Sequence, residues 1–282
     1  MTKRILSALT ADSTLIQAEL ERILALDDAD YGVLLDSMRY STLKTAGKRI
    51  RPFLTLQICR ALGGKDEAAL PLACAVELVH TYSLIHDDLP CMDDDDMRRG
   101  MPSNHKVYGD ATALLAGDGL LTLAFSVIAN ADALSEHARI NAVAALADAA
   151  GCNGMIGGQQ IDLLGETVAL SKDSHKKMNL LKTAAMIKTA AIMGCIAANA
   201  TASALDSAKT YAECIGLAFQ VKDDLLDIGQ EDEKTTYLSF MTKDEATSYL
   251  SELTEKAIKA IAPIDTSGIL TDTALFLRDR TV

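Results

Sequence analysis

Two groups of aspartates lie far apart in the sequence, and each is surrounded by apolar residues. The first group spans residues 87–93 and the second spans residues 223–227. An unpaired carboxylate in apolar surroundings is costly in free energy, so both groups need a positive partner. Divalent cations that bridge a diphosphate would supply one, because Mg²⁺ takes few carboxylates and fills its remaining positions with water and phosphate oxygens.

The second group has the spacing of one helix face. Asp223 and Asp227 are four residues apart, and Gln220 lies three residues before Asp223, so the three side chains would form one stripe on a helix. A solvated acidic helix end would give the same spacing. The apolar neighbours Leu225 and Leu226 favour a partly buried helix instead.

The first group is less regular than the second. Asp87 and Asp93 are six residues apart, and Pro90 between them disrupts a helix locally. A bulge at this proline would return Asp93 to the face of Asp87, and His80 lies two helical turns before Asp87 on the same side. We interpret the aspartates at 94–96 as a solvated acidic run.

Small groups of basic residues accompany the aspartates in an otherwise acidic chain. Arginine and lysine bind phosphate oxygens through charge-assisted hydrogen bonds. Taken singly, each basic residue is more often a surface charge. Together they predict two anion sites, one bridged by metal and one held by basic side chains alone. The residues concerned are Lys48, Arg49, Arg51, Arg98, Arg99, Lys188 and Lys234.

Composition excludes several classes of function. The chain has 282 residues, of which 49% are hydrophobic and 4% aromatic, and this balance favours helices over sheets. A net charge of −12 argues against non-specific nucleic-acid binding. The six cysteines form no CxxC pair, so we expect buried small hydrophobes in a reducing compartment rather than a zinc site. The first residues lack an apolar run of signal-peptide length, and we expect a cytoplasmic protein.

Helical periodicity runs through most of the chain without a linker. It predicts one all-α domain over residues 1–282, a single large helical bundle. The apolar segments at 114–130 and 186–200 are interpreted as core helices rather than membrane spans, because Asp118 and Lys188 interrupt them. The predicted helices are 15–26, 31–46, 52–62, 70–86, 112–129, 137–149, 155–164, 175–199, 203–227 and 243–261.

The chain resembles the short-chain trans-isoprenyl diphosphate synthases, most closely those that make farnesyl diphosphate in bacteria. The likeness covers nearly the whole chain, and the aspartate pair with its two-residue insertion is specific to the family. The motifs are GKRIRP at 47–52, YSLIHDDLP at 82–90, MDDDDMRRG at 92–100, LAGD at 115–118, GGQ at 157–159, DL at 162–163, KT at 188–189, FQVKDDLLD at 219–227 and KTTY at 234–237.

The resemblance implies an isoprenoid synthase fold with a deep central cavity, usually dimeric, with three Mg²⁺ per active site. By the family pattern the metal ligands would be Asp87, Asp88, Asp93, Asp223, Asp224 and Asp227. Arg98, Lys188 and Lys234 would contact the allylic diphosphate, whereas Lys48, Arg51, His80 and Arg99 would hold isopentenyl diphosphate. The resemblance places Thr189 and Gln220 beside the developing allylic cation, and Tyr82 with Ser83 at the floor that limits chain length.

The implied activity is Mg²⁺-dependent condensation of isopentenyl diphosphate with dimethylallyl and then geranyl diphosphate to give farnesyl diphosphate. Geranyl or geranylgeranyl synthesis, and a weakly active or non-catalytic partner subunit, are the alternatives within the family. Such subunits typically lose aspartates from one group, whereas this chain keeps both. A helical His-Asp phosphohydrolase would need more paired histidines than this chain has. The loop after Asp227 is shorter than is usual in the family and lacks one of its lysines.

Overall fold

The computed structural model describes residues 2–44, 47–228 and 235–281, and in these ranges the chain is almost entirely helical, which confirms the predicted all-α fold. The first half contains α1 (Thr2–Ile23), α2 (Gly32–Arg39), the π-helical turn η1 (Tyr40–Lys44), α3 (Ile50–Ala61), α4 (Asp66–Asp87), the strands β1 (Met97–Arg98) and β2 (Met101–Pro102), α5 (Asn104–Tyr108) and α6 (Asp110–Ala129). The second half contains α7 (Glu136–Ala150), α8 (Met155–Gly165), α9 (Lys172–Asn179), the π-helical turn η2 (Leu180–Ala184), α10 (Ala185–Ala197), α11 (Ala202–Leu226), the 3₁₀ turn η3 (Tyr237–Ser239), α12 (Lys243–Ile261) and α13 (Ile269–Asp279).

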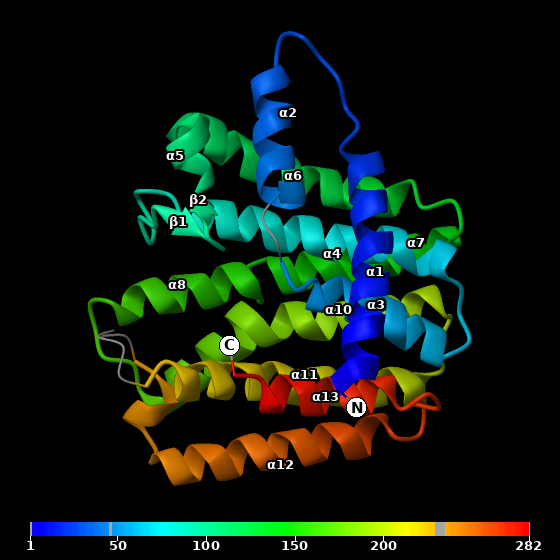
Figure 1. Cartoon of the computed structure of the whole chain (residues 1–282), viewed down its shortest axis with the longest axis vertical. Coiled ribbons are helices and arrows are strands. Elements are labelled where there is room, and N and C mark those ends of the chain that lie inside the picture. Colours follow the sequence, from blue (N-terminus) through cyan, green and yellow to red (C-terminus); the bar gives the residue numbers. More distant parts are fainter. Residues whose placement is uncertain (1, 45–46, 229–234, 282) are drawn as a thin grey trace.

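Helices α4 and α10 form the centre of the bundle. Helix α4 packs against α3, α6 and α10, and α10 also contacts α7 and α11 (Figure 1). Most residues of α4 are buried, which is why its sequence is apolar on nearly every face rather than along one stripe. Helices α12 and α13 pack on the outer side of α11.

The two acidic groups come to the same side of the bundle. The first begins at the carboxyl end of α4, and the second lies at the carboxyl end of α11. In Figure 1 both ends lie on the side where α8 crosses the bundle, although the groups are more than a hundred residues apart in sequence. The antiparallel pair β1–β2 follows α4 directly at this side.

Helix α6 differs from the other apolar helices in its exposure. Three segments are long and apolar enough to cross a membrane by length and composition alone: Asp66–Asp87, Lys172–Ala197 and Asp110–Ala129. The first two have windows that are 72% and 56% buried inside the protein, whereas that of α6 is only 33% buried. The prediction of a core helix at 114–130 therefore holds for one face only: Leu120 and Ile128 are in the core, whereas Leu114 and Leu115 face outward.

The cysteines divide into two classes. Cys59, Cys74, Cys195 and Cys214 are buried, as predicted, whereas Cys91 and Cys152 are exposed. Burial raises the pKa of the Cys59 thiol to about 11 and that of Cys195 to about 12. These two thiols are therefore protonated at neutral pH, as expected of small hydrophobic core residues. The same interpretation is wrong for the two exposed residues.

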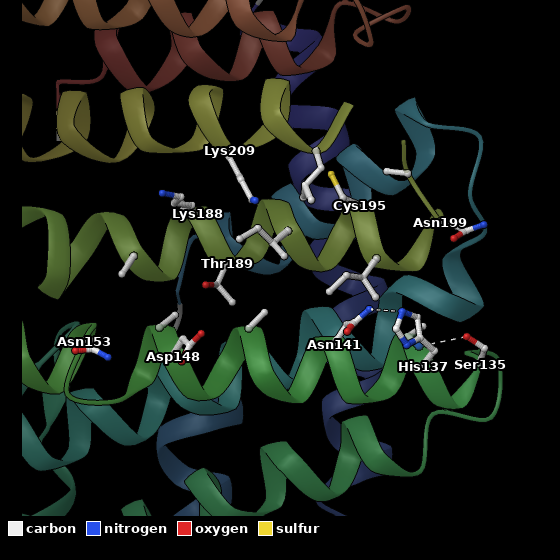
Figure 2. A pocket seen from close by; sticks show the side chains of 18 residues that line it. Ser135, His137, Asn141, Asp148, Asn153, Lys188, Thr189, Cys195, Asn199 and Lys209 are labelled. Atoms are coloured by element: carbon white, nitrogen blue, oxygen red, sulfur yellow. Dashed lines mark hydrogen bonds between the residues drawn. The ribbon is translucent and has the colours of Figure 1, made fainter. Parts of the chain in front are cut away.

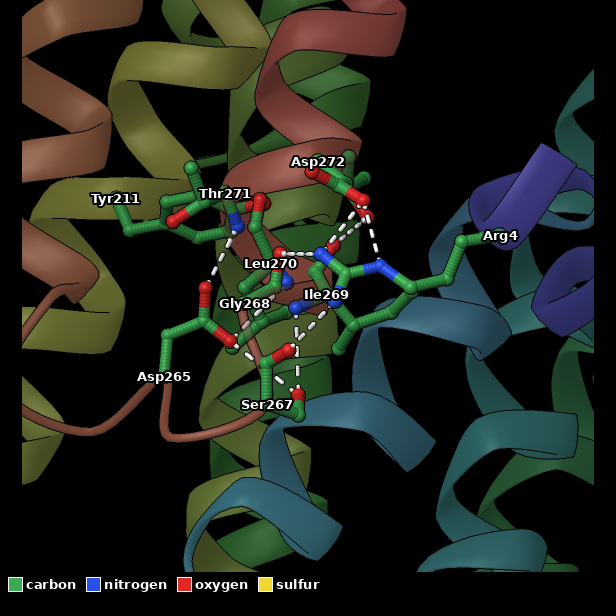
Figure 3. Close-up of polar contacts among 10 residues, drawn as sticks. Arg4, Tyr211, Asp265, Ser267, Gly268, Ile269, Leu270, Thr271 and Asp272 are labelled. Atoms are coloured by element: carbon green, nitrogen blue, oxygen red, sulfur yellow. Dashed lines mark hydrogen bonds and ion pairs between the residues drawn. The ribbon is translucent and has the colours of Figure 1, made fainter. Parts of the chain in front are cut away.

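Helix α13 was not predicted from the sequence, and its first turn is fixed to distant parts of the chain. Arg4 of α1 donates to Asp272 at 2.7 Å and to the carbonyl oxygen of Gly268 at 3.0 Å. The Tyr211 hydroxyl of α11 donates to the carbonyl oxygen of Leu270 at 2.7 Å. Figure 3 shows these contacts converging on the turn before α13. The helix is therefore held between α1 and α11 rather than lying loosely on the surface.

Candidate active site

The first acidic group is shaped by a turn that doubles back on α4. Asp87 is the last residue of α4, and the backbone N–H of Asp93 donates to the carbonyl oxygen of Asp87 at 2.9 Å. This confirms that the insertion around Pro90 returns Asp93 to Asp87. Burial, and the nearby charge of Asp93, raise the pKa of the Asp87 carboxyl to about 6, although Lys182 opposes the shift. Such a buried carboxylate needs a cation close by.

Asp88 has a different role from Asp87. Its carboxylate is buried and accepts a hydrogen bond from Nε of Arg98 at 2.8 Å, and Arg98 also pairs with Asp95 at 2.8 Å. Consecutive helical residues point roughly 100° apart, so Asp88 cannot share the direction of Asp87. Asp88 and Arg98 pair with each other here, and the predicted roles of Asp88 as a metal ligand and of Arg98 at the allylic diphosphate stay predictions.

A cavity of about 570 Å³ opens beside Asp87. Its walls combine apolar side chains with a few converging polar groups, the composition expected of a small-molecule site. The lining residues are Arg51, His80, Tyr82, Ser83, Leu84, His86, Asp87, Met92, Asp118, Leu121, Met155, Ile156, Gln159, Gln160, Leu163, Lys182 and Thr183. We call this space the acidic cavity.

Lys182 and Thr183 are the Lys-Thr pair of the acidic cavity. They lie on the π-helical turn η2, and Nζ of Lys182 pairs with Asp162 of α8 at 2.5 Å. The backbone of this turn approaches α8 so closely that a Cβ on Gly158 would lie 2.2 Å from the backbone nitrogen of Lys182. Glycine at 158 therefore allows the contact that brings Lys182 to the cavity. π-Helical turns of this kind are frequent at functional sites.

Lys188 and Thr189, the predicted pair, lie elsewhere. Lys188 pairs with Glu213 at 3.0 Å, and Thr189 is 3% exposed. Both line a hollow between α7 and α10, to which Lys209 of α11 also contributes (Figure 2). The tetrapeptide Lys-Thr-Ala-Ala occurs twice, at 182–185 and at 188–191. Six residues on a helix amount to roughly 600°, so the copies point about 120° apart. The second copy therefore faces the hollow, and its predicted catalytic role stays a prediction that the first copy is better placed to fill.

A cluster of basic groups borders the cavity. Nε2 of His80 lies 3.4 Å from Nη1 of Arg51 and 3.4 Å from Nη2 of Arg99. A Cβ on Gly47 would lie 2.6 Å from the Arg99 guanidinium, so the lack of a side chain there lets the two basic segments meet. Burial, and then the charges of Arg51 and Arg99, lower the pKa of His80 well below its usual value. Among the residues that the structure describes, neither arginine forms an ion pair with a carboxylate.

Lys48 and Arg49 are adjacent in sequence, but their side chains lie in different surroundings. Arg49 is buried and pairs with Glu77 at 2.5 Å, in a left-handed conformation with φ of 49°. Lys48 is exposed. Burial raises the pKa of the Asp223 carboxyl, and the charge of Lys48 is close enough to oppose this shift slightly, after that of Arg280. The segment before α3 therefore sends one cation into the core and one toward the second acidic group, which links that group to the Arg51–His80–Arg99 cluster.

In the second acidic group, as in the first, neighbouring aspartates have different partners. Asp223 pairs with Arg280 at 2.5 Å, whereas Asp224 accepts a hydrogen bond from the backbone N–H of Tyr237 at 2.6 Å. Burial is the main cause that raises the pKa of Asp224 to about 6. Asp227 is exposed at the end of α11. The Tyr237 contact makes Asp224 an anchor for the following segment.

Three predicted site residues remain. Tyr82 and Ser83 line the acidic cavity, as their predicted role requires, and the buried Tyr82 hydroxyl has no hydrogen-bond partner among the described residues. Gln220 is half-buried on α11 but does not line the cavity. Gln159, whose buried amide nitrogen is also without a partner there, occupies the wall instead. Lys234 lies outside the described residues.

The cavity side of the first group fits a hard divalent cation. Asp87 and Asp93 offer carboxylate oxygens, the ligands that Mg²⁺ prefers over nitrogen or sulfur. The raised pKa of Asp87 reflects like charge and burial that a bound cation would offset. Asp94, Asp96 and His105 also lie close together, but Lys106 already pairs with Asp96 at 2.6 Å.

Comparisons with known proteins agree with this geometry. The sequence model of the polyprenyl synthetase family matches residues 33–259. Farnesyl diphosphate synthase of Bacillus subtilis is 45% identical over 203 residues, which are 71% of this chain and 68% of that protein. Geranylgeranyl pyrophosphate synthase 3 of Arabidopsis thaliana is 45% identical over 204 residues, 71% of this chain and 56% of that protein.

Solved structures extend the likeness to the whole fold. An FPP/GFPP synthase from Zymomonas mobilis superposes with a TM-score of 0.92 at 35% identity, over 98% of this chain and 99% of that one. A putative farnesyl-diphosphate synthase from Marinomonas sp. MED121 gives a TM-score of 0.89 at 36% identity, with 98% and 99% covered. The chain belongs to the polyprenyl synthetase family and is a prenyltransferase.

Proposed function

We propose that the protein condenses isopentenyl diphosphate with dimethylallyl and then geranyl diphosphate to release farnesyl diphosphate. The observation that carries the proposal is the pairing of opposite charges around one cavity. Asp87 lies at one part of its wall, and the Arg51–His80–Arg99 cluster borders another. An apolar interior between them suits a prenyl chain that carries a charged group at its end.

The basic cluster is the proposed site of isopentenyl diphosphate. Two guanidinium groups and one imidazole lie close enough to one another to share a single anion, and no described carboxylate is paired with either arginine. Arginine suits phosphate because its planar donors bind two oxygens together. Lys48 would extend this site toward the second acidic group.

The acidic groups are the proposed site of the allylic diphosphate. Asp87 and Asp93, with Asp223 at the carboxyl end of α11, would hold Mg²⁺, for which the family pattern implies three ions. Bound cations would neutralise charge on the departing diphosphate. Lys182 would contact the same diphosphate in place of Lys188, since it already lies close enough to Asp87 to affect its pKa.

The remaining cavity residues would protect and direct the reactive allylic group. Thr183 and Gln159 offer polar atoms on the wall, where oriented oxygens stabilise developing positive charge without the reorganisation that water requires. The apolar residues around them exclude water. These two residues take the roles that the sequence assigned to Thr189 and Gln220.

Chain length follows from Tyr82 in this proposal. Its ring lies in the cavity wall five residues before Asp87, and its edge contacts the His86 ring at a centroid distance of 5.6 Å. A fixed ring at this depth supports a fifteen-carbon product. Geranylgeranyl diphosphate is the alternative, because the relatives include synthases of both products.

A second copy of the chain is the proposed cover of α6. This helix exposes Leu114 and Leu115 to 47% and 55%, and exposed apolar surface of this kind marks an interaction site. The resulting homodimer would work in the cytoplasm, where both diphosphate substrates are soluble.

Product analysis tests the proposal. Purified protein is incubated with Mg²⁺, isopentenyl diphosphate and, in turn, dimethylallyl, geranyl or farnesyl diphosphate, and the products are separated by chain length. We expect farnesyl diphosphate from the first two substrates and little extension of the third. Efficient extension of farnesyl diphosphate would establish the longer-chain alternative, and no product from any substrate would contradict the activity.

A further inference from the structure

Arg280, the residue that follows α13, makes several contacts with α11 through one end of its guanidinium, while its buried Nε has no hydrogen-bond partner among the described residues. Nη2 donates to Oδ1 of Asp223 at 2.5 Å and to the carbonyl oxygen of Phe219 at 3.0 Å. The guanidinium carbon lies 3.8 Å from the centre of the Phe219 ring. Only 9% of the Arg280 side chain is exposed. A cation–π contact, a carbonyl and a carboxylate therefore fix one guanidinium in place.

These contacts constrain Asp223 more than they constrain α13. Phe219 and Asp223 are four residues apart, so Arg280 spans one turn of α11 along the face that carries the carboxylate. Arg280 occupies Oδ1, and Oδ2 accepts no hydrogen bond from the described residues. The arginine therefore fixes the side-chain torsions of Asp223 and leaves one oxygen available.

The position of Arg280 is determined by the helix that precedes it. The first turn of α13 is held by Arg4 and by Tyr211. Asp265 adds hydrogen bonds to the backbone N–H groups of Leu270 at 3.2 Å and Thr271 at 2.8 Å (Figure 3). A helix fixed at its start carries the following residue to a defined place.

We propose that Arg280 is a positioning residue for the second acidic group. It orients Asp223 so that Oδ2 is presented to a divalent cation, in the way that hydrogen-bonded neighbours orient metal-binding carboxylates in other proteins. This inference rests on the proposed function, because it assumes that Asp223 holds a metal there. The affinity of this site for its cation would then depend on Arg280, which lies more than fifty positions from Asp223 in sequence.

The test compares Arg280→Gln with Arg280→Lys and with a matched control. Arg278→Gln is the control, since Arg278 lies on α13 two residues before Arg280 and its Nε pairs with Asp279 at 2.6 Å. Binding of Mn²⁺ in the presence of inorganic diphosphate is measured from the electron paramagnetic resonance signal of free Mn²⁺. Turnover is measured separately against Mg²⁺ concentration.

We expect Arg280→Gln to weaken Mn²⁺ binding by about tenfold to a hundredfold, the usual effect of removing a neighbour that orients a ligand. Turnover at saturating Mg²⁺ should fall much less than the Mg²⁺ half-saturation constant rises. Arg280→Lys keeps a cation and should restore part of the affinity, whereas Arg278→Gln should match the parent protein. A merely structural role would instead lower thermal stability without this separation.

Three results would overturn the inference. The first is unchanged Mn²⁺ binding by Arg280→Gln. The second is tighter Mn²⁺ binding by this variant, which would make Arg280 a competitor of the cation. The third is an equal loss of Mn²⁺ affinity in the control Arg278→Gln. If Arg280→Gln does not fold, the same comparison is made with Arg280→Met, which also removes the charge, and normal Mn²⁺ binding by it together with an unchanged Mg²⁺ half-saturation constant contradicts the proposal. Metal binding is measured without prenyl substrates, so failure of the proposed activity is distinguished from failure of this inference.

Discussion

The acidic cavity is smaller than the hollow between α7 and α10, but it is the one lined by groups suited to catalysis. The hollow is the larger, at about 750 Å³ against about 570 Å³. Each contains a Lys-Thr pair from the same helical stretch. Only the acidic cavity combines a buried carboxylate of raised pKa with a basic cluster that lacks carboxylate partners among the described residues. Volume therefore says less about function than the charges that converge on the space.

The largest effect that separates the two spaces is expected from their aspartates. Asp87→Ala should lower turnover on the order of 10³-fold or more, because departure of the diphosphate depends on metal charge. Asp148→Ala, its counterpart in the hollow, should stay close to the parent. Steady-state turnover at saturating Mg²⁺, with circular dichroism as a check on folding, decides the matter. Turnover of Asp87→Ala near that of the parent would rule out the acidic cavity.

A smaller difference, in affinity for isopentenyl diphosphate, is expected between a basic residue of the acidic cavity and one of the hollow. Arg51→Ala removes one charge-assisted contact worth about 1.5–3 kcal/mol, which corresponds to about tenfold to a hundredfold in affinity for isopentenyl diphosphate. Lys209→Ala in the hollow should leave this affinity unchanged. Calorimetry with isopentenyl diphosphate and with an allylic diphosphate separates the sites. Equal weakening of both ligands by Arg51→Ala would show that the basic cluster is not selective.

Stability without metal gives a third contrast. The folded-state pKa of Asp87 is raised to about 6, so the folded protein holds a proton that the unfolded chain releases, and stability falls as pH rises from about 4 to about 6. Asp87→Asn should abolish this fall and gain about 1–3 kcal/mol above the window. Asp148→Asn, at an exposed position, should unfold like the parent. Urea unfolding in chelator across this pH range checks both, and a loss of stability in Asp87→Asn at neutral pH would contradict the assignment.

Substitutions in the cavity walls are expected to have the smallest effect on rate, but they should change the chain length of the product. Tyr82→Ala should open space that a growing tail can fill, with a gain of about 25 cal/mol per Å² of apolar surface buried. Longer products should therefore appear. Ser83→Phe should shift products toward ten carbons, and Ile192→Ala in the hollow should change nothing. Chain-length analysis of folded variants is the measurement. An unchanged product spectrum in active Tyr82→Ala would place the floor elsewhere.

Much of the fold could be predicted from local sequence. Periodicity predicted the second half of α1 and all the α-helices from α2 to α12 except the short α5, because a long apolar stripe at helical spacing has few other uses. It missed α13, although Leu270, Ala274 and Leu277 follow that spacing over eleven residues. A short helix depends on what it packs against rather than on its own propensity, and α13 packs mainly against α12, α1 and α11.

The site was only partly predictable, for two physical reasons. A repeated tetrapeptide has one sequence but two directions, so the choice between Lys182 and Lys188 required the helix phase set by the π-helical turn. Adjacent carboxylates such as Asp87 and Asp88 likewise point in different directions, and only the position of Arg98 separates their roles. The Gly-Gly-Gln motif at 157–159 is visible in the sequence, but the role of Gly158 in the Lys182 contact follows only from the packing of α8 against η2.

The paired variants Lys182→Ala and Lys188→Ala test the central claim most directly, because the same substitution is made in two copies of one tetrapeptide. Steady-state turnover with dimethylallyl and isopentenyl diphosphates is measured for both folded proteins. We expect Lys182→Ala to lose about tenfold to a hundredfold in turnover over Michaelis constant for the allylic substrate. Lys188→Ala, which breaks only the half-exposed pair with Glu213, should stay within about twofold of the parent. A large loss in Lys188→Ala with little change in Lys182→Ala would contradict the assignment of prenyl transfer to the acidic cavity.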